Sequence, residues 1–201
     1  MRDAVTARNL ADTGESIAMI TTRYLLLSLL FITTLSAHGE EAKLSGEAIQ
    51  AEDGDTLQVN IAGNSQRIQL SGIDAPEDRE NPKFKVDRQR TGLDDESLLA
   101  LGVIATEHLR RLLRGDQTFE LRYDPAHPDR YGRIPGELFN GAGVSINRRM
   151  VSDGYAIALP SPETDAGGYV ELQRQAREEK RGLWGLMNKP TLSWSGVDAK
   201  P

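Results

Sequence analysis

The alternation of polar and apolar positions predicts strands in the first third of the folded region. Residues 56–61 alternate, and residues 67–73 alternate again, which is typical of half-buried strands. Turn signals stand before and between them, at Asp53-Gly54-Asp55 and at Gly63-Asn64-Ser65,. We therefore expect a meander of three strands between Ala42 and about Gly72.

The clearest helical pattern lies in the middle of the chain. Apolar residues recur at helical spacing over residues 97–113, and Gly115 follows as a C-cap,. Residues 76–95 before this helix are rich in charge and have little apolar periodicity. We expect them to form a long exposed loop.

The pattern after the central helix predicts two more strands and further helices. Strands are expected over 118–123 and 134–139 with a turn at Tyr131-Gly132, then helices over 145–153 and 169–181, then a flexible tail over 188–201. Three strands, a helix, two strands and further helices are the order of a five-stranded oligonucleotide-binding (OB-fold) barrel. The expected class is a β-barrel with about three α-helices (α+β), with the domain spanning residues 42–187.

The N-terminal segment has the pattern of a signal peptide. Residues 24–35 are an apolar, Ser and Thr run that follows Arg23 and precedes Ser36-Ala37-His38-Gly39,. A span needs about 20 apolar residues, so the run is short for a membrane helix. We interpret 1–37 as a leader, with Met19 as the better start, and expect export to the periplasm or the medium without stable membrane association. An uncleaved anchor and a buried helix are the alternatives.

Composition excludes several kinds of chemistry. The chain of 201 residues has no cysteine, so disulfides, thiolate metal sites and a thiol nucleophile are absent. His38, His108 and His127 lie far apart without metal-ligand spacing,. A net charge of −6 argues against a nucleic-acid coat protein. It is compatible with an enzyme that meets phosphate through a cation and a few arginines.

Carboxylates near two turns suggest a site for a hard cation. Asp55 lies at the end of the first turn and Asp74 at the end of the third strand. At one mouth of a barrel both can converge on calcium, which prefers oxygen ligands. Turn chemistry for Asp55 and a cap before Pro76 for Asp74 are the alternatives.

Several short motifs stand in one order along the chain. They are Asp53-Gly54-Asp55-Thr56, Gly72-Ile73-Asp74-Ala75-Pro76-Glu77, Asp129-Arg130-Tyr131-Gly132-Arg133, Asn147, Gly154-Tyr155-Ala156, Ala176-Arg177 and Gly182-Leu183-Trp184. From about Leu44 to Trp184 this arrangement resembles the staphylococcal nuclease (thermonuclease) family.

The resemblance implies roles for individual residues. The backbone carbonyl of Ala75 is a third calcium ligand, and Glu77 orients or deprotonates the attacking water. Arg133 clamps the phosphate, while Arg130 and Tyr131 contact the nucleotide. A solvated loop acid is the alternative for Glu77, and purely structural roles are the alternative for Arg130 and Tyr131.

The chain departs from the family pattern at residue 69. Gln69 stands where the family has a second phosphate-binding arginine, and losing such a charge costs on the order of a hundredfold to a thousandfold in rate. Arg67 is a possible substitute, because residues two apart share a face of a strand; a surface charge is its alternative. Residues 159–162 lack the aromatic side chains that stack on the nucleotide in the family,.

These observations predict an exported, monomeric, calcium-dependent endonuclease that hydrolyses phosphodiester bonds in DNA and RNA. The first alternative is a nuclease-like domain that binds nucleic acid or another anion, with catalysis impaired by Gln69. A weaker alternative is a carbohydrate- or protein-binding barrel that works without the metal.

Overall fold

The computed structural model describes residues 39–114, 118–159, 161–162 and 166–197. The expected leader over 1–37, with Met19 and His38, lies outside these residues, and so does Gly115. Within the described ranges, no helix combines the length and the apolar character needed to cross a membrane.

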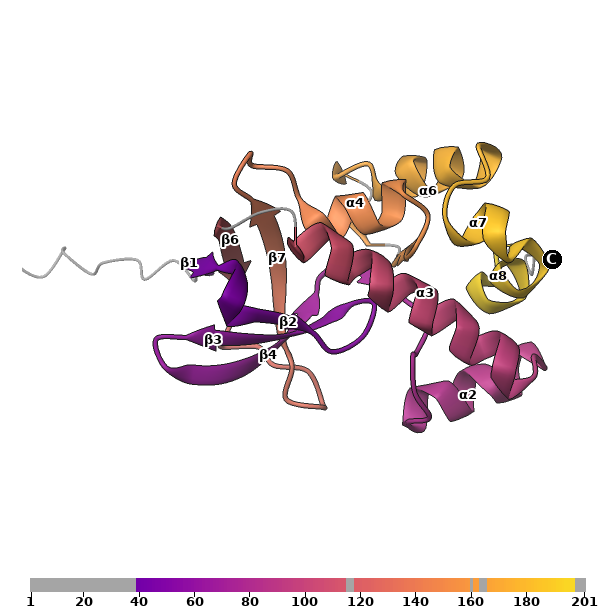
Figure 1. The fold of residues 1–201 in the computed structure, drawn as a ribbon, viewed down its shortest axis with the longest axis horizontal. Coiled ribbons are helices and arrows are strands. Elements are labelled where there is room, and N and C mark those ends of the chain that lie inside the picture. The colour runs from indigo at the N-terminus through magenta and orange to yellow at the C-terminus, as the bar shows by residue number, and fades with distance from the viewer. Residues whose placement is uncertain (1–38, 115–117, 160, 163–165, 198–201) are drawn as a thin grey trace, which may run out of the picture. The chain divides into compact units, whose positions relative to one another are not determined.

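A curled sheet of six strands forms the body of the fold (Figure 1). Its order is β1 (Glu40–Ser45), β6 (Thr118–Tyr123), β7 (Ile134–Asn140), β4 (Asn64–Leu70), β3 (Thr56–Ile61) and β2 (Ile49–Ala51). The β4–β7 pair is parallel and the other pairs are antiparallel. The edge strands β1 and β2 are joined by only three residues, the 3-10 turn η1 (Gly46–Ala48). The sheet must therefore curl until its two edges meet.

This architecture confirms a mixed α+β fold and corrects its details. The expected five-stranded barrel has six strands, because η1 divides the first strand into β1 and β2. The strand expected over 67–73 ends at Leu70, and after a turn with Gly72 at φ +77° the chain forms β5 (Ile73–Asp74). β5 pairs with β8 (Ile157–Ala158) in a separate two-stranded sheet. The described helices also exceed the three expected.

The long helix α3 (Asp95–Arg114) links the barrel to the other helices. It contacts β2, α2 (Pro82–Thr91) and α4 (Ile146–Ser152), as well as α7 (Leu183–Leu186) and α8 (Asn188–Ser195). The helix α6 (Tyr169–Glu178) packs on α4 and α7. Apolar side chains from the strands and from α3 share one core, which includes Leu57, Val59, Ile68, Leu70, Leu101, Leu109, Leu121 and Leu138.

The expected loop over residues 76–95 is wrong, because Pro82–Thr91 form the helix α2. The Asn81 side chain caps its first turn by accepting a hydrogen bond from the backbone N–H of Phe84 at 2.9 Å,. Pro82 suits the first helical position, and Gly92 ends the helix at φ +66°,. Only Phe84 and Asp87 of this helix are buried, so no apolar periodicity marks it.

The expected flexible tail is also corrected, because residues 188–195 form α8. Trp194 is 1% exposed, and its indole Nε1 donates to Asp87 Oδ2 of α2 at 3.3 Å. Thr191 is buried as well, and its hydroxyl donates to the carbonyl of Leu183 at 2.9 Å. Two buried side chains are enough to dock a short helix but too few to produce a periodic pattern.

Candidate active site

The turn between β2 and β3 is held by its own side chains. Asp53 Oδ1 accepts hydrogen bonds from the backbone N–H groups of Asp55 at 3.1 Å and Thr56 at 2.7 Å, as Asp often does in turns. A Cβ atom on Gly54 would lie 2.7 Å from the Cβ of Ala75 and 3.0 Å from that of Ala105. Glycine at position 54 therefore lets the turn lie directly against the segment that follows β5.

Asp55 connects the two segments that carry the predicted cation ligands. Its side chain is buried, with the residue 4% exposed. Oδ2 accepts a hydrogen bond from the backbone N–H of Ala75 at 2.8 Å, and Oδ1 accepts one from the Thr56 hydroxyl at 3.0 Å. The structure thus brings Asp55 beside Asp74 and Ala75, which lie about 20 residues further along the chain.

Arg133 and Gln69 both lie within hydrogen-bond distance of the hydroxyl of Thr56, the residue after Asp55. Arg133 Nη1 donates to the Thr56 hydroxyl at 3.0 Å and lies 3.9 Å from Asp55 Oδ1. Its Nε donates to Asp129 Oδ2 at 2.8 Å. Thr56 pairs with Gln69 across β3 and β4, and the Thr56 hydroxyl lies 3.4 Å from Gln69 Oε1. Gln69 therefore faces the same cluster as Arg133, with an amide where the family has a guanidinium.

Arg67 forms an ion pair with Glu52. Its Nε and Nη2 atoms donate to the two carboxylate oxygens of Glu52, both at 2.7 Å. Such a two-pronged pair fixes the guanidinium in one orientation. To act as the substitute for the arginine missing at residue 69, Arg67 would first have to leave Glu52.

The turn before β7 exposes an aromatic ring beside Arg133. Asp129 Oδ1 accepts from the backbone N–H groups of Tyr131 at 2.8 Å and Arg133 at 2.9 Å. The ring of Tyr131, a residue 49% exposed, has the guanidinium carbons of Arg130 and Arg133 at 4.8 and 5.6 Å from its centroid. This arrangement places an accessible aromatic surface next to the predicted phosphate clamp.

Glu77 lies in a set of contacts that the sequence did not reveal. It is 7% exposed, accepts a hydrogen bond from the Asn81 amide, and has Lys83 Nζ 3.0 Å from its Oε1. Lys83 also lies 3.0 Å from Asp74 Oδ1 and 3.5 Å from Asp87 Oδ2. The available signals were the capping pair Asn81-Pro82 and the four-residue spacing of Lys83 and Asp87.

The carboxylates crowd one another enough to shift their pKa values. Burial, and then repulsion from Asp55 and Glu77, raises the pKa of Asp53 to about 7. Burial also raises the pKa of Asp74 to about 6, with Asp55 adding to the rise and Lys83 opposing it. Burial alone would lower the pKa of Lys83, but the surrounding carboxylates outweigh it and raise that pKa. The site holds more negative charge than its own cations offset, which favours an added cation.

The donors present fit a hard cation only with the help of the backbone. Among the described residues, no three His, Asp or Glu side chains are arranged to hold a metal by themselves. Asp74 Oδ1 and the Ala75 carbonyl oxygen do converge, since each lies 3.0 Å from Lys83 Nζ. Asp55 is tied to the same segment through the Ala75 N–H. Two carboxylates and a carbonyl are suitable ligands for calcium when water completes the shell.

The two histidines in the described residues take no part in this site. His108 stacks on Tyr155, with ring centroids 3.8 Å apart, and its Nε2 lies 3.0 Å from Asp153 Oδ2. His127 Nδ1 lies 2.7 Å from Asp124 Oδ2.

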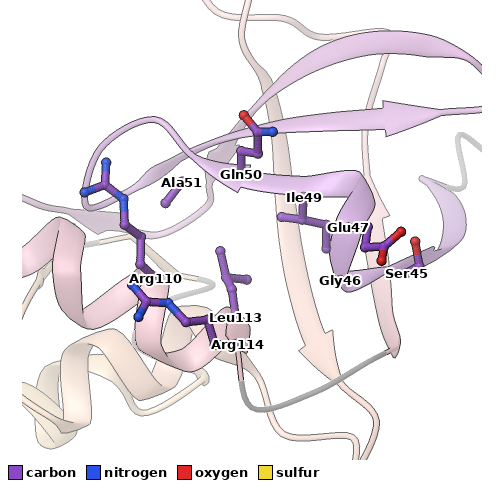
Figure 2. Close-up of a pocket in the computed structure, with 9 residues that line it drawn as sticks. All are labelled: Ser45, Gly46, Glu47, Ile49, Gln50, Ala51, Arg110, Leu113 and Arg114. Carbon is purple, nitrogen blue, oxygen red and sulfur yellow. The ribbon is translucent and has the colours of Figure 1, made fainter.

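A separate groove of about 730 Å³ lies between β2 and the end of α3. Figure 2 shows Arg110, Leu113 and Arg114 reaching from α3 toward the segment that carries Gln50 and Ala51. None of the candidate site residues lines this groove. Arg110 and Arg114 are both within ion-pair distance of Glu107. Because its lining shares no residue with the cluster, this groove is separate from the candidate active site.

Comparison with known proteins identifies the family. The model of the staphylococcal nuclease homologue family matches residues 67–185, more than half of the chain. The chain therefore belongs to this family. It is 32% identical over 143 residues to an uncharacterized endonuclease of Escherichia coli, covering 71% of this chain and 78% of the relative.

Two further relatives have nuclease names. The chain is 30% identical over 159 residues to the micrococcal nuclease of Shigella flexneri, covering 73% of this chain and 77% of the relative. It is 27% identical over 168 residues to the thermonuclease of Staphylococcus hyicus, covering 80% of this chain and 90% of the relative.

Proposed function

We propose that this protein is an exported, calcium-dependent endonuclease of the thermonuclease type that hydrolyses phosphodiester bonds of DNA and RNA as a monomer. One observation carries the proposal. Asp55, the segment Asp74 to Glu77, and Arg133 are far apart in the sequence, yet the bonds described above link them into one connected polar cluster. Family membership and the nuclease names of the relatives support the same reaction class.

Glu77 is the group that would activate water. A positioned carboxylate can orient or deprotonate the attacking water. Burial and the contacts with Asn81 and Lys83 restrict the orientations of this side chain. A general base held in one orientation loses little entropy when the reaction begins.

Arg133 is the group that would bind the phosphate. Its bonds to Asp129 and Thr56 use two of the five N–H donors of a guanidinium. Donors on both Nη atoms are left for a phosphate, and the Asp129 contact through Nε fixes the plane in which they lie. The guanidinium would stabilise the charge that develops on the phosphate oxygens.

Asp55, Asp74 and the Ala75 carbonyl would hold the calcium ion. When bound, this ion supplies positive charge that polarises the phosphate and offsets the crowded carboxylates. The chain itself supplies the geometry, because the N–H of Ala75 fixes Asp55 against β5.

A second candidate function is a nuclease-like domain that binds nucleic acid or another anion with impaired catalysis. Gln69 and the pairing of Arg67 with Glu52 favour it. Together they leave the cluster without the second guanidinium that the family uses at this place.

Cleavage assays on the whole chain separate the two candidates. Single-stranded DNA and RNA are incubated with the protein in calcium and in chelator. The variants are Glu77→Gln, Gln69→Arg and, as a control with the same charge change on an exposed side chain, Glu80→Gln. If the protein is a calcium-dependent endonuclease, it cleaves in calcium and not in chelator. The cleavage rate of Glu77→Gln then falls by about a hundredfold to ten-thousandfold, and Glu80→Gln keeps the wild-type rate.

Other outcomes show which part of the proposal is wrong. An inert wild type beside an active Gln69→Arg supports the impaired-catalysis candidate. Cleavage that persists in chelator contradicts calcium dependence. Export is tested separately by expressing the chain in a bacterium and sequencing the N-terminus of the mature protein. A product that retains residues 24–35 contradicts a cleaved leader.

A further inference from the structure

The ammonium of Lys83 lies where the predicted cation ligands converge. Its Nζ is 3.0 Å from Asp74 Oδ1, 3.0 Å from the Ala75 carbonyl oxygen and 3.0 Å from Glu77 Oε1. The first two oxygens are the proposed calcium ligands, and the third belongs to the proposed general base. A tethered monovalent cation thus occupies the centre of the site.

Lys83 and a calcium ion cannot use these oxygens together without strong repulsion. Calcium binds oxygen at about 2.3–2.6 Å, while Lys83 Nζ already lies within hydrogen-bond distance of the same atoms. Two cations sharing one set of ligands would lie within a few ångströms of each other, at a cost that low local dielectric enlarges. One cation has to leave before the other can bind fully.

The structure also gives Lys83 a way to leave. Its side chain is 32% exposed, and it lies in the first turn of α2, so its stem can swing without unwinding the helix. Asp87, one helical turn further on, has its Oδ2 atom 3.5 Å from the ammonium and is a second partner at the edge of the site. Asp87 is itself held in place by Arg90 at 2.8 Å and by the indole of Trp194.

We infer that Lys83 is a resident counter-cation that a divalent ion must displace from Asp74, Ala75 and Glu77, so that α2 sets the concentration of divalent ion the protein requires. This inference rests on the proposed function, since it assumes that calcium uses these ligands. In the absence of calcium, Lys83 stabilises the folded carboxylate cluster. In its presence, Lys83 moves toward Asp87 and releases Glu77 to face water.

The consequence for affinity follows from competition. If the site is free of Lys83 for only a tenth of the time or less, the apparent dissociation constant for calcium is raised about tenfold or more. Replacing Lys83 by an uncharged side chain removes the competitor. The same change removes the counter-charge of the cluster, so the calcium-free protein becomes less stable.

Calcium titration calorimetry on four whole-chain proteins tests the inference. They are the wild type, Lys83→Met, Lys83→Gln and Lys85→Met. Lys85 is exposed on the same helix, so its variant carries the same charge change without touching the cluster. We expect both Lys83 variants to bind calcium at least about tenfold more tightly than the wild type and Lys85→Met.

Thermal unfolding gives a second readout without catalysis. In chelator, the Lys83 variants should melt below the wild type, and calcium should raise their melting temperatures more than it raises that of the wild type. A Lys83→Met protein that folds only with calcium supports the inference as well.

Results that contradict the role of Lys83 differ from results that contradict the proposed function. Equal or weaker calcium binding by both Lys83 variants, relative to Lys85→Met, overturns the role of Lys83 and leaves the proposed function intact. No calcium binding by any of the four proteins contradicts calcium dependence itself. Cleavage by the wild type in chelator that Lys83→Gln abolishes overturns displacement, because Lys83 would then replace the divalent ion permanently.

Discussion

Gly102 of α3 controls the position of Glu77 through a backbone contact. A Cβ atom built on Gly102 would lie 2.0 Å from the carbonyl oxygen of Glu77, 2.2 Å from its carbonyl carbon and 2.5 Å from the backbone nitrogen of Asp78. All three are backbone atoms, so no flexible side chain can give way. Gly102→Ala must therefore push the Glu77 segment and α3 apart.

The size of the effect differs between stability and rate. The new Cβ atom and the backbone of Glu77 and Asp78 must separate by about 1 to 1.5 Å before they reach ordinary van der Waals contact,. Overpacking costs about 1–3 kcal/mol, but alanine in place of glycine stabilises a helix interior by about 1 kcal/mol. The net loss of stability is about 0–2 kcal/mol. Misplacing a catalytic group by about 1 Å can cost on the order of a hundredfold in rate.

Cleavage kinetics and urea unfolding check this prediction together. We expect kcat for single-stranded DNA to fall about a hundredfold in Gly102→Ala while KM changes little, because the role proposed for Glu77 is to act on water and not on substrate affinity. Val103→Ala is the matched control, since this neighbouring residue is 49% exposed. A kcat for Gly102→Ala close to that of the control would refute the argument that α3 positions Glu77.

Three further predictions concern the fold. Trp194→Ala should lower the free energy of unfolding by about 3–5 kcal/mol, because it empties a fully buried site,; a loss under about 1 kcal/mol in urea unfolding would mean that α8 is not docked. Asn147→Ala should cost about 2–4 kcal/mol, because the buried amide donates to two backbone carbonyls and accepts from a backbone N–H,; chemical denaturation with an unchanged midpoint would contradict this. Burial acts to raise the pKa of Asp153, but hydrogen bonds from His108 and Arg149 outweigh it, so that pKa lies below its ordinary value. The stability that ionised Asp153 contributes is present above about pH 4 and is lost as the pH falls through the pKa of this group in the folded protein. Asp153→Asn should therefore cost up to about 1 kcal/mol at neutral pH and progressively less as the pH falls below about 4, and a difference from the wild type that does not shrink on acidification would show another cause.

The features predicted correctly from the sequence depend on neighbouring residues. The strands predicted over residues 56–61 and 118–123 match β3 and β6 in both bounds, because the pattern of polar and apolar positions along one strand reports which of its faces is buried. The turn at residues 53–55 follows from Asp and Gly chemistry within a few residues. The motifs that carry the family resemblance contain Asp55, Asp74 and Arg133, which the fold then brings into one cluster.

The features that were missed depend on contacts between distant segments. The helices α2 and α8 each bury only two residues, and they stabilise each other through Asp87 and Trp194, which lie 107 residues apart. A pattern read along a single segment cannot show a partner so far away. The sequence predicted an exposed loop around Glu77, whereas the structure buries Glu77 and follows it with the helix α2.

By itself, the sequence determined the family, most of the strands, the central helix and the carboxylates of the proposed cation site, since each has a local pattern or a motif. Only the tertiary structure decided which charges meet there. Arg67, which shares a strand face with Gln69, donates two hydrogen bonds to Glu52. Lys83, which looked like one charge among many in an exposed loop, lies 3.0 Å from the oxygens of Asp74 and Ala75. The reason is that the reach of a long charged side chain depends on where its backbone is held, and the packing of α2 sets that position.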